Sequence, residues 1–169
     1  PQSIPAGETY QSLEKGTLDA AEWVGPYDDE KLGFNKVAPY YYYPGWWEGG
    51  PEVSFYVNTK AQAALSAENK AILEAACAYA AEDTRSKYDA LNPIALKKLV
   101  ANKTKLLPFP KDVMEGSFKA SMEVFAANVS KSPEWKKIYA DMKNFQRDQL
   151  LWFRFCEAGF DNFMYTRKI

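Results

Sequence analysis

Residues 19 to 58, DAAEWVGPYDDEKLGFNKVAPYYYYPGWWEGGPEVSFYVN, form the stretch around which the chain is organised. Short apolar segments alternate here with glycine and proline. Two of them end on a glutamate beside tryptophan, at Glu22-Trp23 and at Trp46-Trp47-Glu48. A buried carboxylate is costly unless it is paired, hydrogen-bonded or bound to a cation. Two such carboxylates in strand-like segments therefore indicate one shared ligand.

A hard cation is one ligand that suits these residues. Sodium and calcium take several oxygen ligands from carboxylates, carbonyls and waters. Glu22, the backbone carbonyl of Trp23 and Glu48 would supply part of such a shell. A second interpretation, favoured by the spacing alone, is that the two glutamates form salt bridges or lie in solvent.

The composition restricts the class of protein. The 169 residues are 47% hydrophobic and carry a net charge of -1, which suits a globular chain and gives no basic excess for nucleic acid. No run of about 18 apolar residues is present to span a membrane. The first residues lack the basic and apolar regions of a signal peptide. Histidine is absent, which lowers the expectation of an enzyme.

Periodicity and turn residues predict an α/β fold. Strands are expected at 2–5, 18–23, 40–43, 52–58 and 105–109. Helices are expected over 6–16, after Gly25-Pro26, from Ser66 to 92, over 114–129 and from Ser132 onward.

Two details of the predicted helices concern charged and proline residues. Asn92-Pro93 is expected to kink or restart its helix, because proline disfavours helical geometry in the residue before it. Asp28-Asp29-Glu30 is interpreted as a solvated first helical turn, where the helix dipole favours negative charge.

Several quoted stretches also carry a family resemblance. SIPAGETYQSLEKGTLDAAEWVGPYDDEKLGF, YYYYPGWWEGGPEVSFYVN, AACAYAAEDTRSKYDALNP, LLPFP and the aromatic C-terminal stretch resemble the second half of the DctP-type solute-binding subunits of TRAP (tripartite ATP-independent periplasmic) transporters. The likeness covers essentially the whole chain, whereas family members are about twice as long. It is strongest to the branch that binds 2-oxo and 2-hydroxy monocarboxylates with a metal ion.

The resemblance implies a set of site residues. In that branch the positions matching Glu22, the Trp23 carbonyl and Glu48 hold a cation, sodium or calcium, and the solute's carboxylate and 2-oxo or 2-hydroxy group complete the shell. Trp23 and Trp47 would form walls of the pocket. Asn58 is a weaker candidate for binding substrate, where the family's two lobes meet. A further side-chain ligand and the arginine that clamps the solute belong to the half that these residues do not match.

The implied function is transport without chemistry. The chain is expected to belong to a periplasmic receptor that captures a small organic acid such as pyruvate or lactate and delivers it to TRAP membrane permease subunits. Two other classes remain open from the residues. One is a hydrolase that uses Glu22 and Glu48 as acid and base, and the other is a helical protein-interaction module. The chain is not expected to bind nucleic acid.

The family also implies an architecture. The chain would be part of a two-lobe α/β binding protein with strands that cross between the lobes and long C-terminal helices. Residues 1–20 and 61–130 would belong to lobe II, and residues 21–60, with the metal segment, to lobe I. Residues 131–169 would form a C-terminal helical segment. Its many aromatic residues, from Trp135 onward, predict a homodimer that packs through this segment.

Overall fold

The computed structural model describes residues 1–167, and the chain forms two compact units, Pro1–Pro110 and Lys111–Ile169. Each unit is described by itself. Residues 168 and 169 of the predicted C-terminal segment lie outside the described residues. Within residues 1–167, no helix combines the length and the apolar character needed to cross a membrane.

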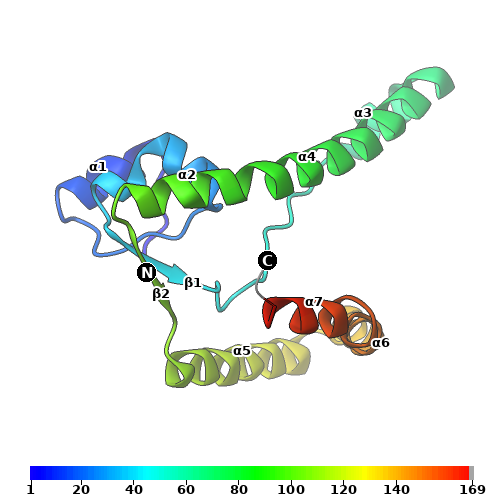
Figure 1. Cartoon of the computed structure of the whole chain (residues 1–169). Coiled ribbons are helices and arrows are strands. Elements are labelled where there is room, and N and C mark those ends of the chain that lie inside the picture. Colours follow the sequence, from blue (N-terminus) through cyan, green and yellow to red (C-terminus); the bar gives the residue numbers. More distant parts are fainter. Residues whose placement is uncertain (168–169) are drawn as a thin grey trace. The chain divides into compact units, whose positions relative to one another are not determined.

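The first unit contains a small parallel sheet (Figure 1). Strand β1, Tyr40–Tyr43, pairs with β2, Lys105–Pro108, in a register that aligns Tyr40 with Lys105 and Tyr43 with Pro108. The amide of Phe109 extends the ladder by donating to the carbonyl of Tyr43 at 2.7 Å. Parallel strands require a long crossover, and the helices between β1 and β2 provide it. Both strands are confirmed where the sequence predicted them.

Short helices precede the sheet. η1, Ala6–Glu8, leads into α1, Thr9–Glu14, and α2, Pro26–Leu32, is followed by η2, Phe34–Lys36. α2 begins with proline in its first turn, where a missing amide costs nothing. It ends at Gly33, whose φ of 75° favours glycine. The helices predicted here are therefore confirmed.

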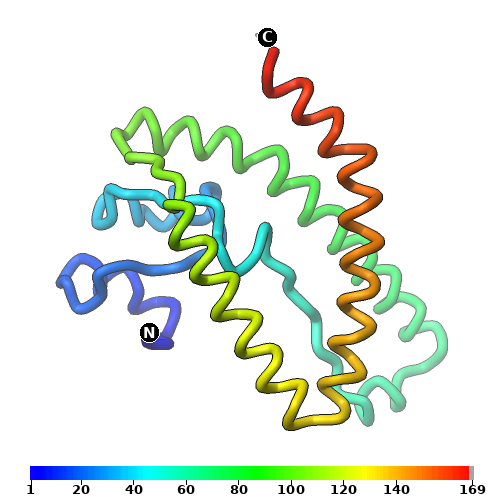
Figure 2. Tube along the Cα trace, turned by 90° about the horizontal axis from the view of Figure 1, so that it is seen from below, coloured from blue at the N-terminus to red at the C-terminus, as the bar shows by residue number. Residues whose placement is uncertain are grey.

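The crossover consists of α3, Thr59–Ala64, and the long α4, Ala67–Ala101. Ser66 caps α4 as predicted, since its hydroxyl accepts from the amide of Asn69 at 3.2 Å. The predicted interruption at Asn92-Pro93 is wrong, because α4 continues through Pro93 (Figure 2). Proline removes one helical hydrogen bond there. The Asn92 side chain gains one with α2 by accepting from the Tyr27 amide at 3.0 Å.

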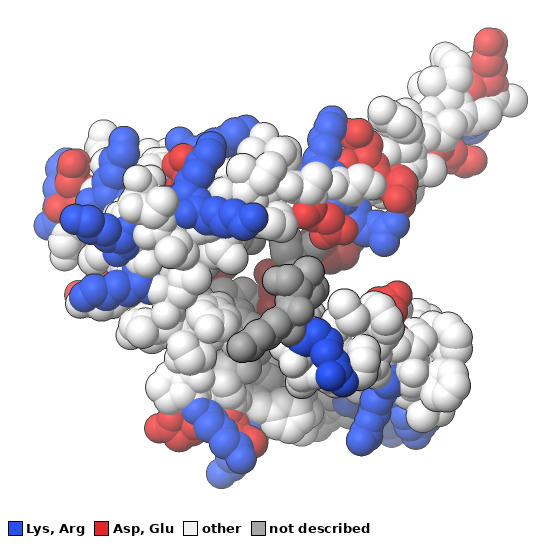
Figure 3. All heavy atoms as spheres, viewed as in Figure 1, with Lys and Arg blue, Asp and Glu red and all other residues white. Residues whose placement is uncertain are grey.

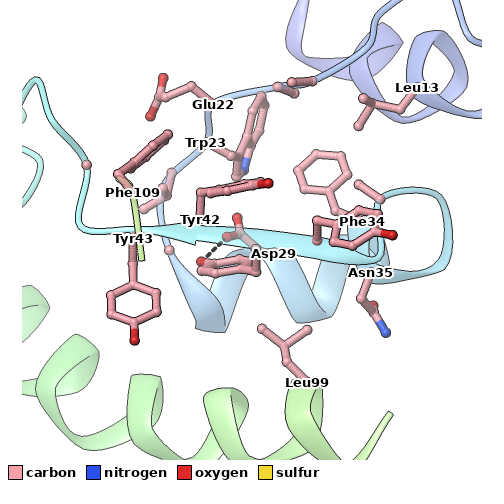
Figure 4. Close-up of a pocket in the computed structure, with 18 of the residues that line it drawn as sticks. Leu13, Glu22, Trp23, Asp29, Phe34, Asn35, Tyr42, Tyr43, Leu99 and Phe109 are labelled. Carbon is pink, nitrogen blue, oxygen red and sulfur yellow. Dashed lines mark hydrogen bonds between the residues drawn. The ribbon is translucent and has the colours of Figure 1, made fainter. Parts of the chain in front are cut away.

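Packing of α2 on the C-terminal part of α4 forms the core of this unit. Leu99 and Ala95, both on α4, are the fully enclosed apolar residues among those described, at 1% and 2% exposure. The edge of the contact is polar: the Tyr88 hydroxyl donates to Asp28 at 2.6 Å, and Lys98 lies 3.7 Å from Glu30. In Figure 4, Leu99 rises from α4 toward β1. These contacts fix α2 and β1 beside one another.

Three predicted strands do not form in the structure. Residues 2–5, 18–23 and 52–58 have no strand partner within residues 1–167, where the sheet has two strands. Extended backbone is stable as a strand only when a neighbour takes up its amides and carbonyls. The alternation over 52–58 therefore leaves both faces in solvent, with Val53 and Tyr56 each 89% exposed.

The second unit is entirely helical within its described residues. It contains α5, Lys111–Lys131, α6, Pro133–Phe155, and α7, Glu157–Tyr165. α6 begins after Ser132, as predicted, and the Ser132 hydroxyl caps it by accepting from the Trp135 amide at 3.1 Å. Phe125 of α5 stacks with Trp135 and Tyr139 of α6 at centroid distances of 5.8 and 5.2 Å. No residue of these three helices is fully buried.

Candidate cation and solute site

A cavity of about 800 Å³ opens in the first unit (Figure 4). Its wall is built from residues 18–25, 37–43 and 47–51, with Leu13, Asp29, Phe34, Asn35, Gly45, Leu99 and Phe109. The strand β1 runs through the cavity wall, and Glu22 and Trp23 lie on the opposite side of β1 from Leu99. The predicted 18–23 segment thus reaches the cavity as extended chain rather than as a strand.

Aromatic packing positions the first candidate pair. The Trp23 ring meets Phe34 edge to face, with a centroid distance of 5.4 Å. This contact keeps the indole half-buried, while the neighbouring Glu22 side chain remains exposed at the cavity. Trp23 therefore anchors the backbone that carries the Glu22 carboxylate and the Trp23 carbonyl.

A tight turn positions the second pair, Trp47 and Glu48. A Cβ placed on Gly45 would lie 3.0 Å from the Glu48 carbonyl oxygen and 3.4 Å from the Trp47 ring. A side chain at Gly45 would force these neighbours to shift. The Trp46 and Trp47 rings meet edge to face at 5.3 Å, which further stiffens the turn. Glycine at 45 therefore suits the close approach of this turn, which carries Glu48 at the cavity.

The charges of the cavity wall have one sign. Its ionisable carboxylates belong to Asp19, Glu22, Asp29 and Glu48, and among residues 1–167 no lysine or arginine lines it. Lysine and arginine side chains gather instead over the outer face of α2 and the C-terminal part of α4 (Figure 3). Such a wall attracts a cation and repels a free carboxylate anion.

Asp29 is the residue of this site that sequence reasoning missed. It is 7% exposed, so its interpretation as part of a solvated turn is wrong. The Tyr41 hydroxyl of β1 donates to Asp29 Oδ2 at 2.5 Å, whereas Oδ1 is buried without a hydrogen-bond partner. Burial raises the pKa of Asp29 to about 6 against the opposing hydrogen bonds from Tyr41 and the Gly25 backbone, and the charges of Asp28 and Glu22 add to the rise.

Four of the five predicted side chains meet at this cavity. Glu22, Trp23, Trp47 and Glu48 all line it. Asn58 does not, because it caps α3 by accepting from the amides of Lys60 and Ala61 at 3.0 and 3.1 Å. Within residues 1–167, no three acidic or thiol side chains come close enough to enclose a metal ion by themselves. Glu22, the Trp23 carbonyl and Glu48 are all oxygen donors and fit a hard cation as part of its shell.

The family of the chain follows from comparison with known proteins. The chain belongs to the DctP family, the bacterial extracellular solute-binding proteins of family 7, whose pattern matches residues 1–163. The predicted family is confirmed. This is a family of solute-binding transport proteins.

Individual relatives share both sequence and fold. A monocarboxylate 2-oxoacid-binding periplasmic protein of Nostoc sp. is 44% identical over 162 residues, which are 96% of this chain and 44% of that protein. A TRAP transporter solute-binding protein from Bordetella bronchiseptica RB50 is 51% identical, with a TM-score of 0.93 over 98% of this chain and 49% of its own. That structure is a mixed-occupancy dimer, with copurified calcium and picolinate in one active site and an apo site.

A third relative carries a different solute. The TRAP periplasmic solute-binding protein from Colwellia psychrerythraea, with bound calcium and pyruvate, is 35% identical, with a TM-score of 0.90 over 96% of this chain and 50% of its own. The present chain spans about half the length of these relatives. The predicted membership of a TRAP-type binding fold is confirmed.

Proposed function

We propose that this chain forms part of a periplasmic receptor that binds a hard cation together with a small 2-oxo or 2-hydroxy monocarboxylate. The observation that supports the proposal is the cavity wall, which Glu22 and Glu48 both line and to which no lysine or arginine of residues 1–167 contributes. The relatives described with calcium and pyruvate, or calcium and picolinate, support it.

Each predicted residue has a role in this proposal. Glu22, the Trp23 carbonyl and Glu48 hold the cation, and Trp23 and Trp47 exclude water from the pocket so that the ion contacts are stronger. The bound cation supplies the positive charge that the solute's carboxylate needs beside an acidic wall. Calcium is the preferred ion of the proposal because two relatives contain it, and sodium is the alternative. Asn58 stays the weaker candidate for binding the solute, and within the described residues its side chain caps α3.

The remainder of the receptor is part of the same proposal. Residues 1–20 and 61–130 are assigned to lobe II, 21–60 to lobe I and 131–169 to a C-terminal helical segment. In a receptor as long as the relatives, the residues outside this sequence complete both lobes and supply the arginine that clamps the solute. Closure of the two lobes retains the solute, which is then delivered to the TRAP permease in the membrane.

The calcium dependence of solute binding tests the proposal. Calorimetric titration of pyruvate into the receptor polypeptide that contains these residues is expected to show binding with calcium and at least tenfold weaker binding after chelation. Magnesium at the same concentration serves as the control, because it demands a smaller and more regular octahedral shell. Equal pyruvate affinity with and without calcium would reject the cation site.

We also propose that the C-terminal segment mediates a homodimer. Large side chains of α6 and α7 are exposed, including Leu151 at 72% and Phe155 at 81%. Apolar surface of this kind marks an interface. The relative from Bordetella bronchiseptica is described as a dimer. Truncation of the receptor before Ser132 is expected to halve the mass measured by light scattering. A receptor that is monomeric at tens of micromolar before truncation would end this part of the proposal.

A further inference from the structure

Asp29 is a buried acid that the proposed cation ligands do not explain. Carboxylates are rarely buried without a basic partner. None of the ion pairs that the structure describes within residues 1–167 includes Asp29. One of its oxygens is held by Tyr41, and the other is enclosed without any partner. The hydrogen bonds from Tyr41 and the Gly25 backbone therefore offset only part of the free-energy cost of burying Asp29.

The position of Asp29 connects it to the acidic cavity. Asp29 lines the same cavity as Glu22 and Trp23, and in Figure 4 its side chain rises from α2 toward Trp23 with the dashed bond to Tyr41. Burial is the main cause of the raised pKa of Asp29, and the charge of Glu22 makes the smallest contribution to the rise, which puts the two carboxylates within electrostatic range of each other. Because Asp29 lines the cavity, its charge would also act on a cation that Glu22 held there.

Two features keep this charge in place. The Tyr41 hydroxyl donates to Oδ2 and lies on β1, which pairs with β2 and cannot move independently. The backbone of Asp29 is fixed as well, since its amide donates to the Gly25 carbonyl at 2.9 Å at the start of α2. A fixed charge that solvent does not reach is screened less than a surface charge.

We propose that Asp29 is a positioning residue of the cation site, whose buried negative charge, held by Tyr41, strengthens cation binding by Glu22 and Glu48 without contacting the ion. The inference rests on the proposed function, because it needs a cation in the cavity. In this proposal, Glu22 and Glu48 contact the ion, and the buried charge of Asp29 acts on it from a greater distance. Tyr41 contributes by fixing the orientation of the Asp29 carboxylate through its hydrogen bond.

Calcium titration without solute tests this inference. Asp29→Asn in the receptor polypeptide that contains these residues is expected to weaken calcium binding about tenfold, the size expected for one unit charge acting through a medium of intermediate dielectric. Asp28→Asn is the matched control. Asp28 is the adjacent carboxylate, also bonded to a tyrosine, but it does not line the cavity. Its substitution is expected to change calcium affinity less than twofold.

Two further measurements separate charge from structure. The terbium ion carries three positive charges, so Asp29→Asn is expected to weaken terbium binding more than calcium binding. A distorted site would instead weaken the binding of both ions equally. Tyr41→Phe is expected to weaken calcium binding in the wild-type background and to have no further effect in the Asp29→Asn background. Tyr41→Phe also keeps the test available if Asp29→Asn does not fold.

The outcomes distinguish the inference from the function on which it rests. Wild-type receptor that binds no calcium would reject the proposed function itself. Wild-type binding that Asp29→Asn leaves within twofold would overturn only the role of Asp29. Equal losses for calcium and terbium, or additive effects of the two substitutions, would also overturn it, because they indicate a structural role.

Discussion

The two units of the chain are stabilised in different ways. In Pro1–Pro110, residues far apart in sequence meet: α2 packs on α4, β1 pairs with β2, and every fully buried residue that the structure describes lies here. In Lys111–Ile169, the described contacts join helices that follow one another along the chain, and no helix has a fully buried residue. The first unit can therefore hold side chains at fixed positions, which a binding site requires.

This difference teaches where to look for each kind of function. A cavity with defined walls needs long-range contacts, because these determine which segments become neighbours. A run of helices with local contacts leaves its apolar faces for a further surface to cover. Substitutions in the two units should accordingly affect different properties, namely binding in the first unit and assembly in the second.

The largest contrast is expected for Glu48→Gln. Loss of a charged ligand should weaken calcium binding by about 3 kcal/mol or more, and pyruvate binding with it, since the affinities of the two ligands are linked. Glu52→Gln is the control, because Glu52 lies outside the cavity and bonds only to Ser54. Trp152→Ala in the second unit should leave calcium affinity unchanged. Calorimetry on the three variants would refute the separation if Trp152→Ala matched Glu48→Gln.

A core substitution should sharpen the contrast in stability. Leu99→Ala removes the most enclosed side chain and is expected to lower the free energy of unfolding by about 3 kcal/mol. Ile138→Ala in α6 is the matched change at a side chain that is 69% exposed, and should cost less than about 1 kcal/mol. Urea denaturation measures both. Similar losses would show that the second unit has a core of comparable quality.

The pH dependence of stability should isolate Asp29. Its pKa is about 6 in the folded chain against an ordinary value of 3.8, so between these values the folded state binds more protons than the unfolded state. Stability from this group therefore falls as pH rises from about 4 to about 6. The free energy of unfolding of Asp29→Asn, relative to that of wild type, should therefore rise by about 2 kcal/mol between pH 4 and pH 7. Urea denaturation at the two pH values measures this difference. A constant difference between the two proteins would contradict the raised pKa.

The smallest expected effect concerns the helix caps, one in each unit. Ser66→Ala and Ser132→Ala each remove a hydroxyl that accepts a backbone amide, and each should cost about 1 kcal/mol. Neither residue lines the cavity, so calcium affinity should stay within twofold of wild type. Thermal denaturation measures the cost. A cap whose removal changes calcium binding strongly would show that helix ends and site are coupled.

Local patterns predicted the elements that depend on local interactions. The cap at Ser66, the helix start at Ser132-Pro133, the short strand of four tyrosines and the aromatic helices all follow from neighbours within a few residues. The carboxylates Glu22 and Glu48 were found because each stands beside tryptophan at the end of an apolar segment, and the structure brings both to one cavity.

Features that depend on distant partners were not predictable in the same way. The 52–58 alternation is typical of a strand, but a strand also needs a neighbour, and the sequence does not show which segments pair. The burial of Asp29 depends on Tyr41, twelve residues away, and on the packing of α2 against α4. The continuity of α4 through Pro93 depends on Asn92 bonding to Tyr27, 65 residues away. In each case tertiary contacts override the local preference.

The long helix α4 has a mechanical consequence. α2 holds it near its C-terminal end, through contacts with Asn92 and Lys98, while its side chains from Ala67 to Ala81 are mostly exposed. Its 35 residues span about 52 Å at 1.5 Å per residue. The helix is thus anchored at one end beside the cavity, and its other end projects into solvent. A tilt of about 5° at the anchored end would move the free end by about 3 Å over the roughly 35 Å between them. A force applied at the free end would likewise exert a torque on the residues that anchor the helix beside the cavity.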